Sequence, residues 1–172
     1  MIRKLRSVLL SAALLVTAFG AHAEDTEQVF GSWTLRCSAA ADSKLDCMMF
    51  QNLVQKTGGQ PVLQFGIGMA PPEGLPTVLV SLPLGISLPP GITIQIDNGS
   101  PATFPVERCE PDGCRAGMKL RDATVQQLTQ GRQLHITFYD GARKPLKVPL
   151  SLDGFGASFK ALVAAQQPAP GS

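Results

Sequence analysis

Short runs of alternating apolar and polar residues recur along this chain, and each run ends in Gly, Pro, Asn or Asp. Trp33, Leu35 and Cys37 form one such face, and Ile92, Ile94 and Ile96 form another. A period of two places alternate side chains on opposite faces of a strand. The pattern predicts an all-β fold, an antiparallel β-sandwich or open barrel of about nine strands with one or two short helices.

The first 23 residues have the pattern of a secretory signal peptide. Three basic residues precede an apolar run over 8–19, and Gly20-Ala21-His22-Ala23 has the small residues of a cleavage site. The run is too short to cross a membrane, which takes about 20 residues. We expect cleavage after Ala23, one β domain over 24–165, a disordered tail over 166–172, no membrane span in the mature form, and a periplasmic or secreted location.

Cleavage would change the charge of the protein. It removes three of 15 basic residues and none of 13 acidic ones, which leaves a net charge of −1. The remaining arginines and lysines are scattered, so they form no basic stripe for a phosphate backbone. We therefore expect no nucleic acid partner.

All four cysteines lie in the mature part, and an even set in an oxidising compartment predicts two disulfides. Three pairings are open, of which we favour the local one, Cys37 with Cys47 across a hairpin and Cys109 with Cys114 around a turn. A zinc site is the weaker alternative, because only one pair has a short ligand spacing. A redox pair would need the C-x-x-C spacing, so we expect structural disulfides, no metal and no cofactor.

Several local signals predict how the domain is assembled. A helix is expected from Asp122, as its N-cap, to Gly131, as its C-cap, and another around Phe155, whose apolar neighbours recur at helical spacing. Pro145 and Pro149 lack amide hydrogens on the same side of one strand. That strand should be a sheet edge that discourages pairing with another chain, which favours a monomer.

One hairpin is expected at Asp97-Asn98-Gly99-Ser100, because Asn-Gly adopts positive φ readily. The returning strand would carry Ala102, Phe104 and Val106 inward and continue to Cys109.

The sequence does not assemble a catalytic set, so we expect no enzyme. The mature chain has one histidine, His135, which lies between core-facing residues and points to the other face. A G-x-S-x-G elbow is absent from the sequence. The carboxylates lie mostly at turns, at Asp97, Asp112, Asp140 and Asp153, although a glycosidase-like pair stays open as an alternative.

The segment over 81–91 is apolar and rich in proline and glycine. Leu84, Ile86 and Leu88 could form an exposed loop that docks a partner. We favour the alternative, in which these side chains pack into the core as the chain crosses between two sheets.

Several motifs in this order resemble the invasion-associated locus B family. They are Gly31-Ser32-Trp33 with Cys37, Cys47 with Gln51, Pro83-Leu84-Gly85-Ile86 with Leu88, Cys109 with Gly113-Cys114, and Leu150-Ser151-Leu152 before Gly154-Phe155. The resemblance covers about 28–163. It implies a periplasmic or secreted protein of alphaproteobacteria, in a family with members linked to entry into host red cells and with no known active-site residue.

The leading hypothesis is an exported, non-enzymatic cell-envelope module that binds a protein, peptide or envelope component. A hydrolase of envelope polymers and a periplasmic inhibitor or chaperone are the alternatives.

Overall fold

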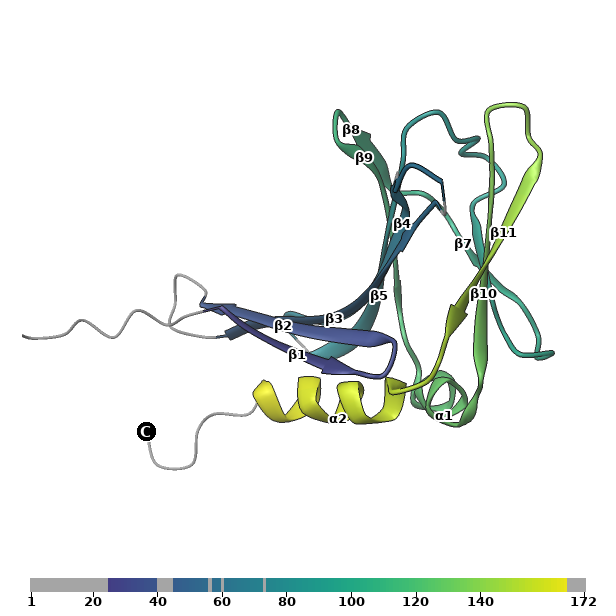
Figure 1. Cartoon of the computed structure of the whole chain (residues 1–172). Helices are drawn as coiled ribbons and strands as arrows, with labels where there is room; N and C mark the ends of the chain where they lie inside the picture. Colours follow the sequence, from purple (N-terminus) through teal and green to yellow (C-terminus); the bar gives the residue numbers. More distant parts are fainter. Residues whose placement is uncertain (1–24, 40–44, 56, 60, 73, 167–172) are drawn as a thin grey trace, which may run out of the picture.

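The protein folds as two antiparallel sheets packed face to face, with a helix at each of two positions along their lower side (Figure 1). The computed structural model describes residues 25–39, 45–55, 57–59, 61–72 and 74–166, with the side chains of Ala39 and Leu45 left aside. The signal segment, the cleavage position after Ala23 and residues 167–172 of the expected tail lie outside this part. The β-sandwich is confirmed, and the described residues form eleven strands and two helices.

The larger sheet has seven strands in the order β1-β2-β3-β4-β5-β9-β8, and the smaller has four in the order β11-β10-β6-β7. The strands of the larger sheet are β1 (Thr26–Phe30), β2 (Trp33–Ala39), β3 (Leu45–Val54), β4 (Pro61–Ala70), β5 (Leu75–Leu82), β8 (Arg108–Glu110) and β9 (Gly113–Lys119). Those of the smaller sheet are β6 (Ile92–Ile96), β7 (Ala102–Phe104), β10 (Gln133–Tyr139) and β11 (Pro145–Ser151). The helices are α1 (Asp122–Gln130) and α2 (Phe155–Ala165).

The core lies where alternate side chains of both sheets and the apolar side of α2 meet. Trp33 is fully buried, and its ring packs edge-on against Phe65 of β4 and Phe155 of α2, with ring centroids 6.1 and 5.1 Å away. Edge-to-face aromatic pairs of this kind contribute about 0.5–1.5 kcal/mol beyond their area. The apolar residues of the alternating runs therefore form the inward face of the sheets. Helix α2 closes the core beneath β1, β2 and β3 (Figure 1).

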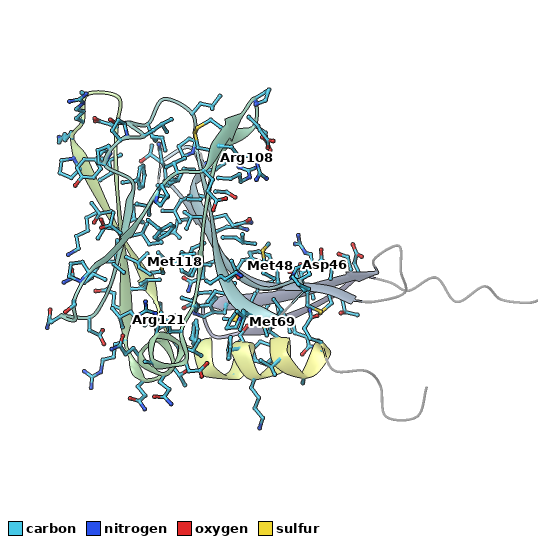
Figure 2. All side chains as sticks on the ribbon, turned by 180° about the vertical axis from the view of Figure 1, so that it is seen from behind. Asp46, Met48, Met69, Arg108, Met118 and Arg121 are labelled. Atoms are coloured by element: carbon cyan, nitrogen blue, oxygen red, sulfur yellow. A yellow bond between two sulfur atoms is a disulfide. The ribbon has the colours of Figure 1, made fainter. Side chains whose placement is uncertain are left out.

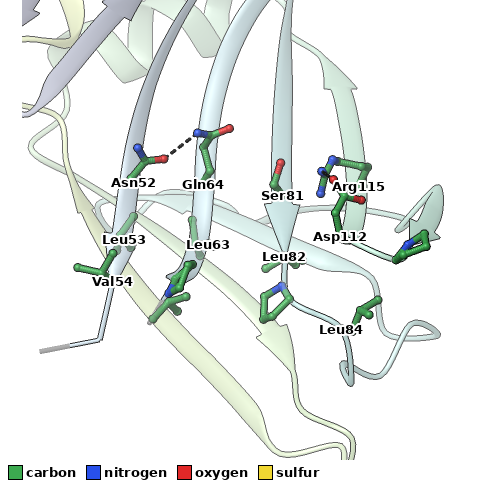
Figure 3. A pocket seen from close by; sticks show the side chains of 14 residues that line it. Asn52, Leu53, Val54, Leu63, Gln64, Ser81, Leu82, Leu84, Asp112 and Arg115 are labelled. Carbon is green, nitrogen blue, oxygen red and sulfur yellow. Dashed lines mark hydrogen bonds and ion pairs between the residues drawn. The ribbon is translucent and has the colours of Figure 1, made fainter. Parts of the chain in front are cut away.

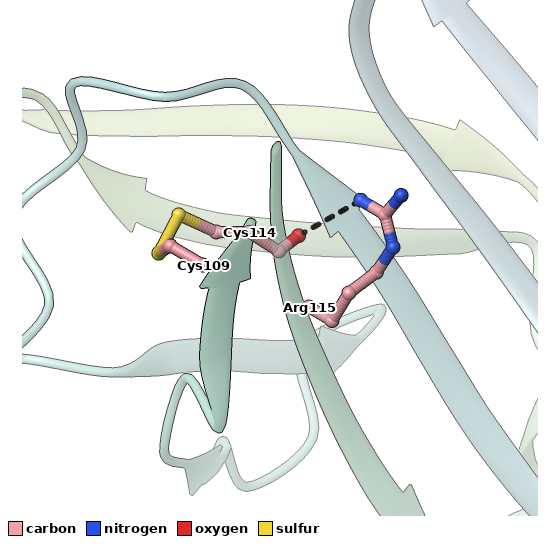
Figure 4. The surroundings of a disulfide bond; sticks show 3 residues. All are labelled: Cys109, Cys114 and Arg115. Carbon is pink, nitrogen blue, oxygen red and sulfur yellow. Dashed lines mark hydrogen bonds between the residues drawn. A yellow bond between two sulfur atoms is a disulfide. The ribbon is translucent and has the colours of Figure 1, made fainter. Parts of the chain in front are cut away.

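Both disulfides join directly opposite residues of neighbouring strands. Cys37 pairs with Cys47 in the β2–β3 register, and Cys109 pairs with Cys114 in the β8–β9 register. The local pairing favoured from sequence is the one present, and the second bond lies beside Arg115, whose guanidinium approaches the Cys114 carbonyl oxygen (Figure 4). No cysteine of the chain is free.

β11 is an edge strand, as its prolines predicted. It pairs only with β10. In this pair Pro145 lies opposite Tyr139, and Pro149 lies opposite His135. Their ring nitrogens cannot donate to β10 or to any added strand, so the outer side of β11 is poor in hydrogen-bond donors.

Two local predictions were wrong in detail. Arg121, not Asp122, occupies the N-cap of α1, and Asp122 is the first helical residue, where its charge still favours the helix dipole. In the hairpin after β6 the positive φ belongs to Asp97, at 47°, and not to Asn98 or Gly99. Asp97 can hold this conformation because its carboxylate accepts the backbone N–H groups of Arg132 and Gln133.

The strand expected from Ala102 to Cys109 is two strands in different sheets. β7 ends at Phe104 in the smaller sheet, and β8 begins at Arg108 in the larger one. Pro105 follows β7 directly and has no N–H to continue a ladder, which explains the break. Because β7 is short and at an edge, Ala102 is exposed rather than inward, while Phe104 is buried as expected.

Among the described residues no helix is long and apolar enough to cross a membrane.

Candidate functional site

Of the residues proposed from sequence as a partner loop, Leu84 and Leu88 do not pack into the core as favoured, whereas Ile86 packs against it. Leu84 and Leu88 are 54% and 45% exposed, and only Ile86 is half-buried. Ile86 forms an isolated bridge to Asp140, which fixes the middle of the loop and leaves the leucines on either side at the surface. The prolines of this segment and Gly85, with φ of 85°, flank the bridge and do not continue a strand on either side of it.

The candidate catalytic residues lie apart from one another. His135 is half-buried on the outer side of the smaller sheet, and its Nδ1 has no hydrogen-bond partner among the described residues. The turn carboxylates serve local structure. Asp97 and Asp140 accept backbone N–H groups, and Asp112 pairs with Arg115 at 2.6 Å. In the described part of the chain no three His, Cys, Asp or Glu side chains gather as a metal site would require.

The feature that stands out is the outer face of the seven-stranded sheet, by which we mean the side away from α2 and the smaller sheet. The sheet bends so that β1, β2 and β3 extend sideways over α2, while β4 and β5 rise toward β8 and β9 (Figure 1). This makes the outer face concave, and no described helix or strand covers it. Asp46 and Met48 lie along one arm of the bend and Arg108 near the end of the other (Figure 2).

A pocket of about 550 Å³ lies on the outer face around Gly68, and we call it the glycine groove. In the strand register Gly68 of β4 faces Met48 on β3 and Thr77 on β5. Gly66 precedes it on the same face, between Phe50 and Leu79. With hydrogen atoms in place of two side chains, the middle strand forms a floor between apolar walls.

The walls of the glycine groove differ in exposure and in side-chain type. Phe50 is only 5% exposed because the guanidinium of Arg36 lies over its ring, 5.2 Å from the centroid. Arg36 is itself held by Glu27, with the closest nitrogen and oxygen 2.7 Å apart. Met48 has an unbranched, polarisable side chain that adapts to different neighbours, and Leu79 is 45% exposed.

A second pocket, of about 680 Å³, adjoins the first at Gln64, which lines both. Its outer-face residues come from four neighbouring strands and stand opposite one another, and we call them the polar row: Asn52, Gln64, Ser81 and Arg115. Gln64 Nε2 donates to Asn52 Oδ1 over 2.7 Å (Figure 3). Leu84 of the exposed loop lines the same pocket, so one of the residues singled out from sequence belongs to this site.

Sequence reasoning missed the remainder of the site. No role was assigned to Gly66 and Gly68 from the sequence. The usable signal was their spacing, because two glycines at i and i+2 within one strand leave a gap on a single face.

Comparison with known proteins agrees with this architecture. The family model described as "Invasion associated locus B (IalB) protein" matches residues 33–163. The chain belongs to the IalB family. Two curated relatives are called Invasion protein B homologs, from Brucella abortus strain 2308 and from Brucella abortus biovar 1 strain 9-941. Each is 25% identical over 154 residues, which is 89% of this chain and 88% of the relative.

A solved structure shares the IalB fold. The crystal structure of invasion associated protein B from Bartonella henselae superimposes with a TM-score of 0.72 at 21% identity, over 82% of this chain and 97% of that one. All of these relatives are named for invasion.

Proposed function

We propose that this IalB-family chain is an exported, non-enzymatic cell-envelope protein that binds a partner through the outer face of its larger sheet. The observation that supports this most is the concave and uncovered outer face, where two adjoining pockets share Gln64. A sheet face that serves only as a solvated surface is expected to carry polar side chains in regular alternation. Here it carries Met48 and the exposed Leu79 beside Gly68, which supports a binding surface.

An exported location is supported by the signal-like N-terminus and by the two disulfides, since such bonds persist outside the cytoplasm. A monomer is supported by the prolines along the β11 edge. A non-enzymatic role is supported by the positions of the carboxylates, because Asp97, Asp140 and Asp112 are engaged in turns and in an ion pair.

Two matched substitutions test the binding surface. Leu79 and Leu146 are both strand leucines with exposed side chains, at 45% and 38%, but only Leu79 lies on the outer face. The oxidised protein is immobilised, an envelope fraction of the source cell is passed over it, and the retained mass is measured. We expect Leu79→Arg to lower retention at least tenfold and Leu146→Arg to leave it unchanged.

Equal retention by both variants, or none by the wild type, would contradict the proposal. Release of soluble fragments from purified envelope polymers by the wild-type protein would instead support the hydrolase alternative.

A further inference from the structure

We propose that the protein has a second contact surface, with which it binds the face of an anionic phospholipid bilayer. This surface is the loop end, by which we mean the loop over 83–91 and the turn over 140–144, at the end of the sandwich away from the two helices (Figure 1). It is separate from the outer face of the larger sheet. Three features of the loop end support it: exposed leucines, cations without ion pairs, and backbone contacts that join the loop to the turn.

Two backbone contacts hold the loop beside the turn. Ile86 forms a bridge to Asp140, and the Ser87 N–H donates to the Tyr139 carbonyl oxygen over 2.8 Å. The turn is closed by Asp140, whose Oδ1 accepts two backbone N–H groups of the turn. Side chains from both segments are therefore presented together, although the segments are about 50 residues apart in sequence.

The loop presents two leucines to solvent. Leu84 is 54% and Leu88 is 45% exposed, while Ile86 between them packs against the core. The loop also contains three prolines, whose fixed φ angles reduce the conformational entropy lost when the leucines are ordered on binding. Exposed apolar side chains beside cations are what a protein segment needs to enter the headgroup boundary of a bilayer.

The turn and the start of β11 supply the cations. Arg143, Lys144 and Lys147 are exposed, and within the described part of the chain none of them forms an ion pair. Asp140 is the carboxylate of the same turn, so three positive charges and one negative charge leave a net charge of +2. A net positive field at this end attracts anionic headgroups.

The carboxylates on the other side of the loop do not cancel this charge. Leu84 lines a pocket together with Asp112, but Asp112 pairs with Arg115 at 2.6 Å. In the same hairpin Glu110 lies 3.4 Å from Arg108. That side of the loop is therefore balanced, and the unbalanced charge lies on the side of the turn.

The backbone of Arg143 gives independent support. Arg143 has φ of 62°, a left-handed conformation that glycine adopts without the cost an L residue incurs. A long charged side chain therefore occupies a position where glycine would be less strained. Local strain of this kind is typical of residues that serve a function.

The shape of the loop end favours a bilayer over an acidic polypeptide. The loop and the turn project at one end of the sandwich, and the two leucines stand on either side of the Ile86 bridge (Figure 1). A folded partner would need a matching cavity for each projecting side chain, whereas a fluid lipid surface adapts to both. Binding then scales with the apolar area inserted plus the attraction of the cations to anionic lipid.

The first test measures sedimentation of the oxidised protein, purified after export, with phosphatidylcholine vesicles that contain or lack phosphatidylglycerol. We expect binding to the anionic vesicles alone, and its loss at about 1 M salt, where the Debye length falls to about 3 Å. Arg143→Gln with Lys144→Gln should lower the partition coefficient about 25-fold, which is about fivefold for each cation. The control pair Arg121→Gln with Lys160→Gln, at exposed residues beside the helices, should leave it unchanged.

The second test concerns the leucines. Leu84→Ser with Leu88→Ser should lower the partition coefficient at least fivefold, whereas Leu75→Ser, at a side chain 42% exposed at the other end of β5, should not. In Leu84→Trp the new indole should be quenched by anionic vesicles with brominated acyl chains. The buried Trp33 provides the unquenched reference.

Equal binding to vesicles without phosphatidylglycerol, an equal loss in the control pair, or no quenching at residue 84 would overturn the inference. If glycerol phosphate or polyglutamate binds these residues while vesicles do not, the ligand is a free anion or an acidic polypeptide and the inference is wrong. Leu79→Ser, on the outer face, should bind vesicles as the wild type does. Retention of envelope material at about 1 M salt then reports the outer face separately.

Discussion

Trp33 and Ser151 are 118 residues apart in sequence and are joined by a hydrogen bond from Trp33 Nε1 to the Ser151 carbonyl oxygen, 3.2 Å long. Gln51 Nε2 donates to the same oxygen over 2.6 Å. Beside them the Ser32 N–H donates to the Asp153 carbonyl oxygen. The turn before β2 is thereby fastened to the segment between β11 and α2, so the motifs that carry the family resemblance form a structural junction.

Replacing Trp33 should therefore destabilise the fold, and alanine should cost more than phenylalanine. Trp33→Phe keeps a ring in the core but loses the bond to Ser151, at a cost of about 1 kcal/mol plus the smaller volume. Trp33→Ala should cost about 3–5 kcal/mol. Both losses of unfolding free energy can be measured by urea unfolding. Circular dichroism is the signal to follow, because Trp33 is the only tryptophan and its replacement removes tryptophan fluorescence. Val29→Ala, at a side chain 69% exposed, should stay within about 0.5 kcal/mol. Equal losses for Phe and Ala at 33 would show that the ring is not packed as described.

Gly154 is required by close approach as well as by its backbone angle. It has φ of 82°, and a Cβ atom there would collide with the Phe30 carbonyl oxygen. Gly85 has φ of 85° and nothing within 4 Å of such an atom. We expect Gly85→Ala to cost about 1–2 kcal/mol from conformation alone and Gly154→Ala considerably more. Comparison of their thermal midpoints separates the two effects, and equal midpoints would refute the role of the contact.

The two glycines of the outer face should respond in opposite directions. Gly68→Ala gains the strand preference of about 0.5–1 kcal/mol without a clash. Gly66→Ala has the same gain but must displace Met48, and overpacking costs typically 1–3 kcal/mol. Denaturant midpoints should rise for the first and fall or stay level for the second. A fall at Gly68 would mean that the fold itself needs this glycine.

The disulfides should open in a fixed order under mild reduction. Cys109 is exposed and Cys114 is buried, whereas Cys37 and Cys47 are only 5% and 1% exposed. A thiol reductant needs access to one sulfur, so Cys109–Cys114 should open first. Alkylation followed by peptide mass analysis reports the order. Loop entropy gives a loss of about 2.2 kcal/mol for this bond and about 2.8 kcal/mol for Cys37–Cys47. Prior labelling of Cys47 would contradict the burial described.

Replacing the edge prolines should promote association. Pro145→Thr with Pro149→Thr restores two N–H groups on the free side of β11, where another strand could pair. Light scattering at increasing concentration should then show a larger share of dimers or larger species than for the wild-type protein. The single change Leu146→Thr serves as a control, because it leaves both prolines in place.

The fold was predictable where side-chain alternation and chain breakers agree. Trp33, Leu134 and Ile136 are buried as their spacing required, and the apolar side of α2 begins at Phe155. An all-β fold, either a sandwich or an open barrel, followed from these patterns, since alternation at period two fixes which face is inward. The edge position of β11 followed from proline chemistry alone.

The remaining errors come from contacts between segments that are distant in sequence. Asp97 takes the positive φ because its carboxylate accepts hydrogen bonds from the N–H groups of Arg132 and Gln133, which lie 35 and 36 residues away in sequence. The Asn-Gly pattern does not reveal these bonds. Leu84 is exposed because Ile86 alone is tied to Asp140. The glycine groove depends on strand order, since Gly68 gains its walls only when β3 and β5 flank β4.

The disulfide between β2 and β3 holds the chain together if the backbone is cut between its two cysteines. Because Cys37 and Cys47 are covalently joined, a protease that cuts once between them would leave the two fragments in a single molecule. Nicked protein would migrate as one species on a gel without reductant and as two with it. One cut in this connection would therefore not separate the N-terminal part of the chain from the remainder until the disulfide is reduced.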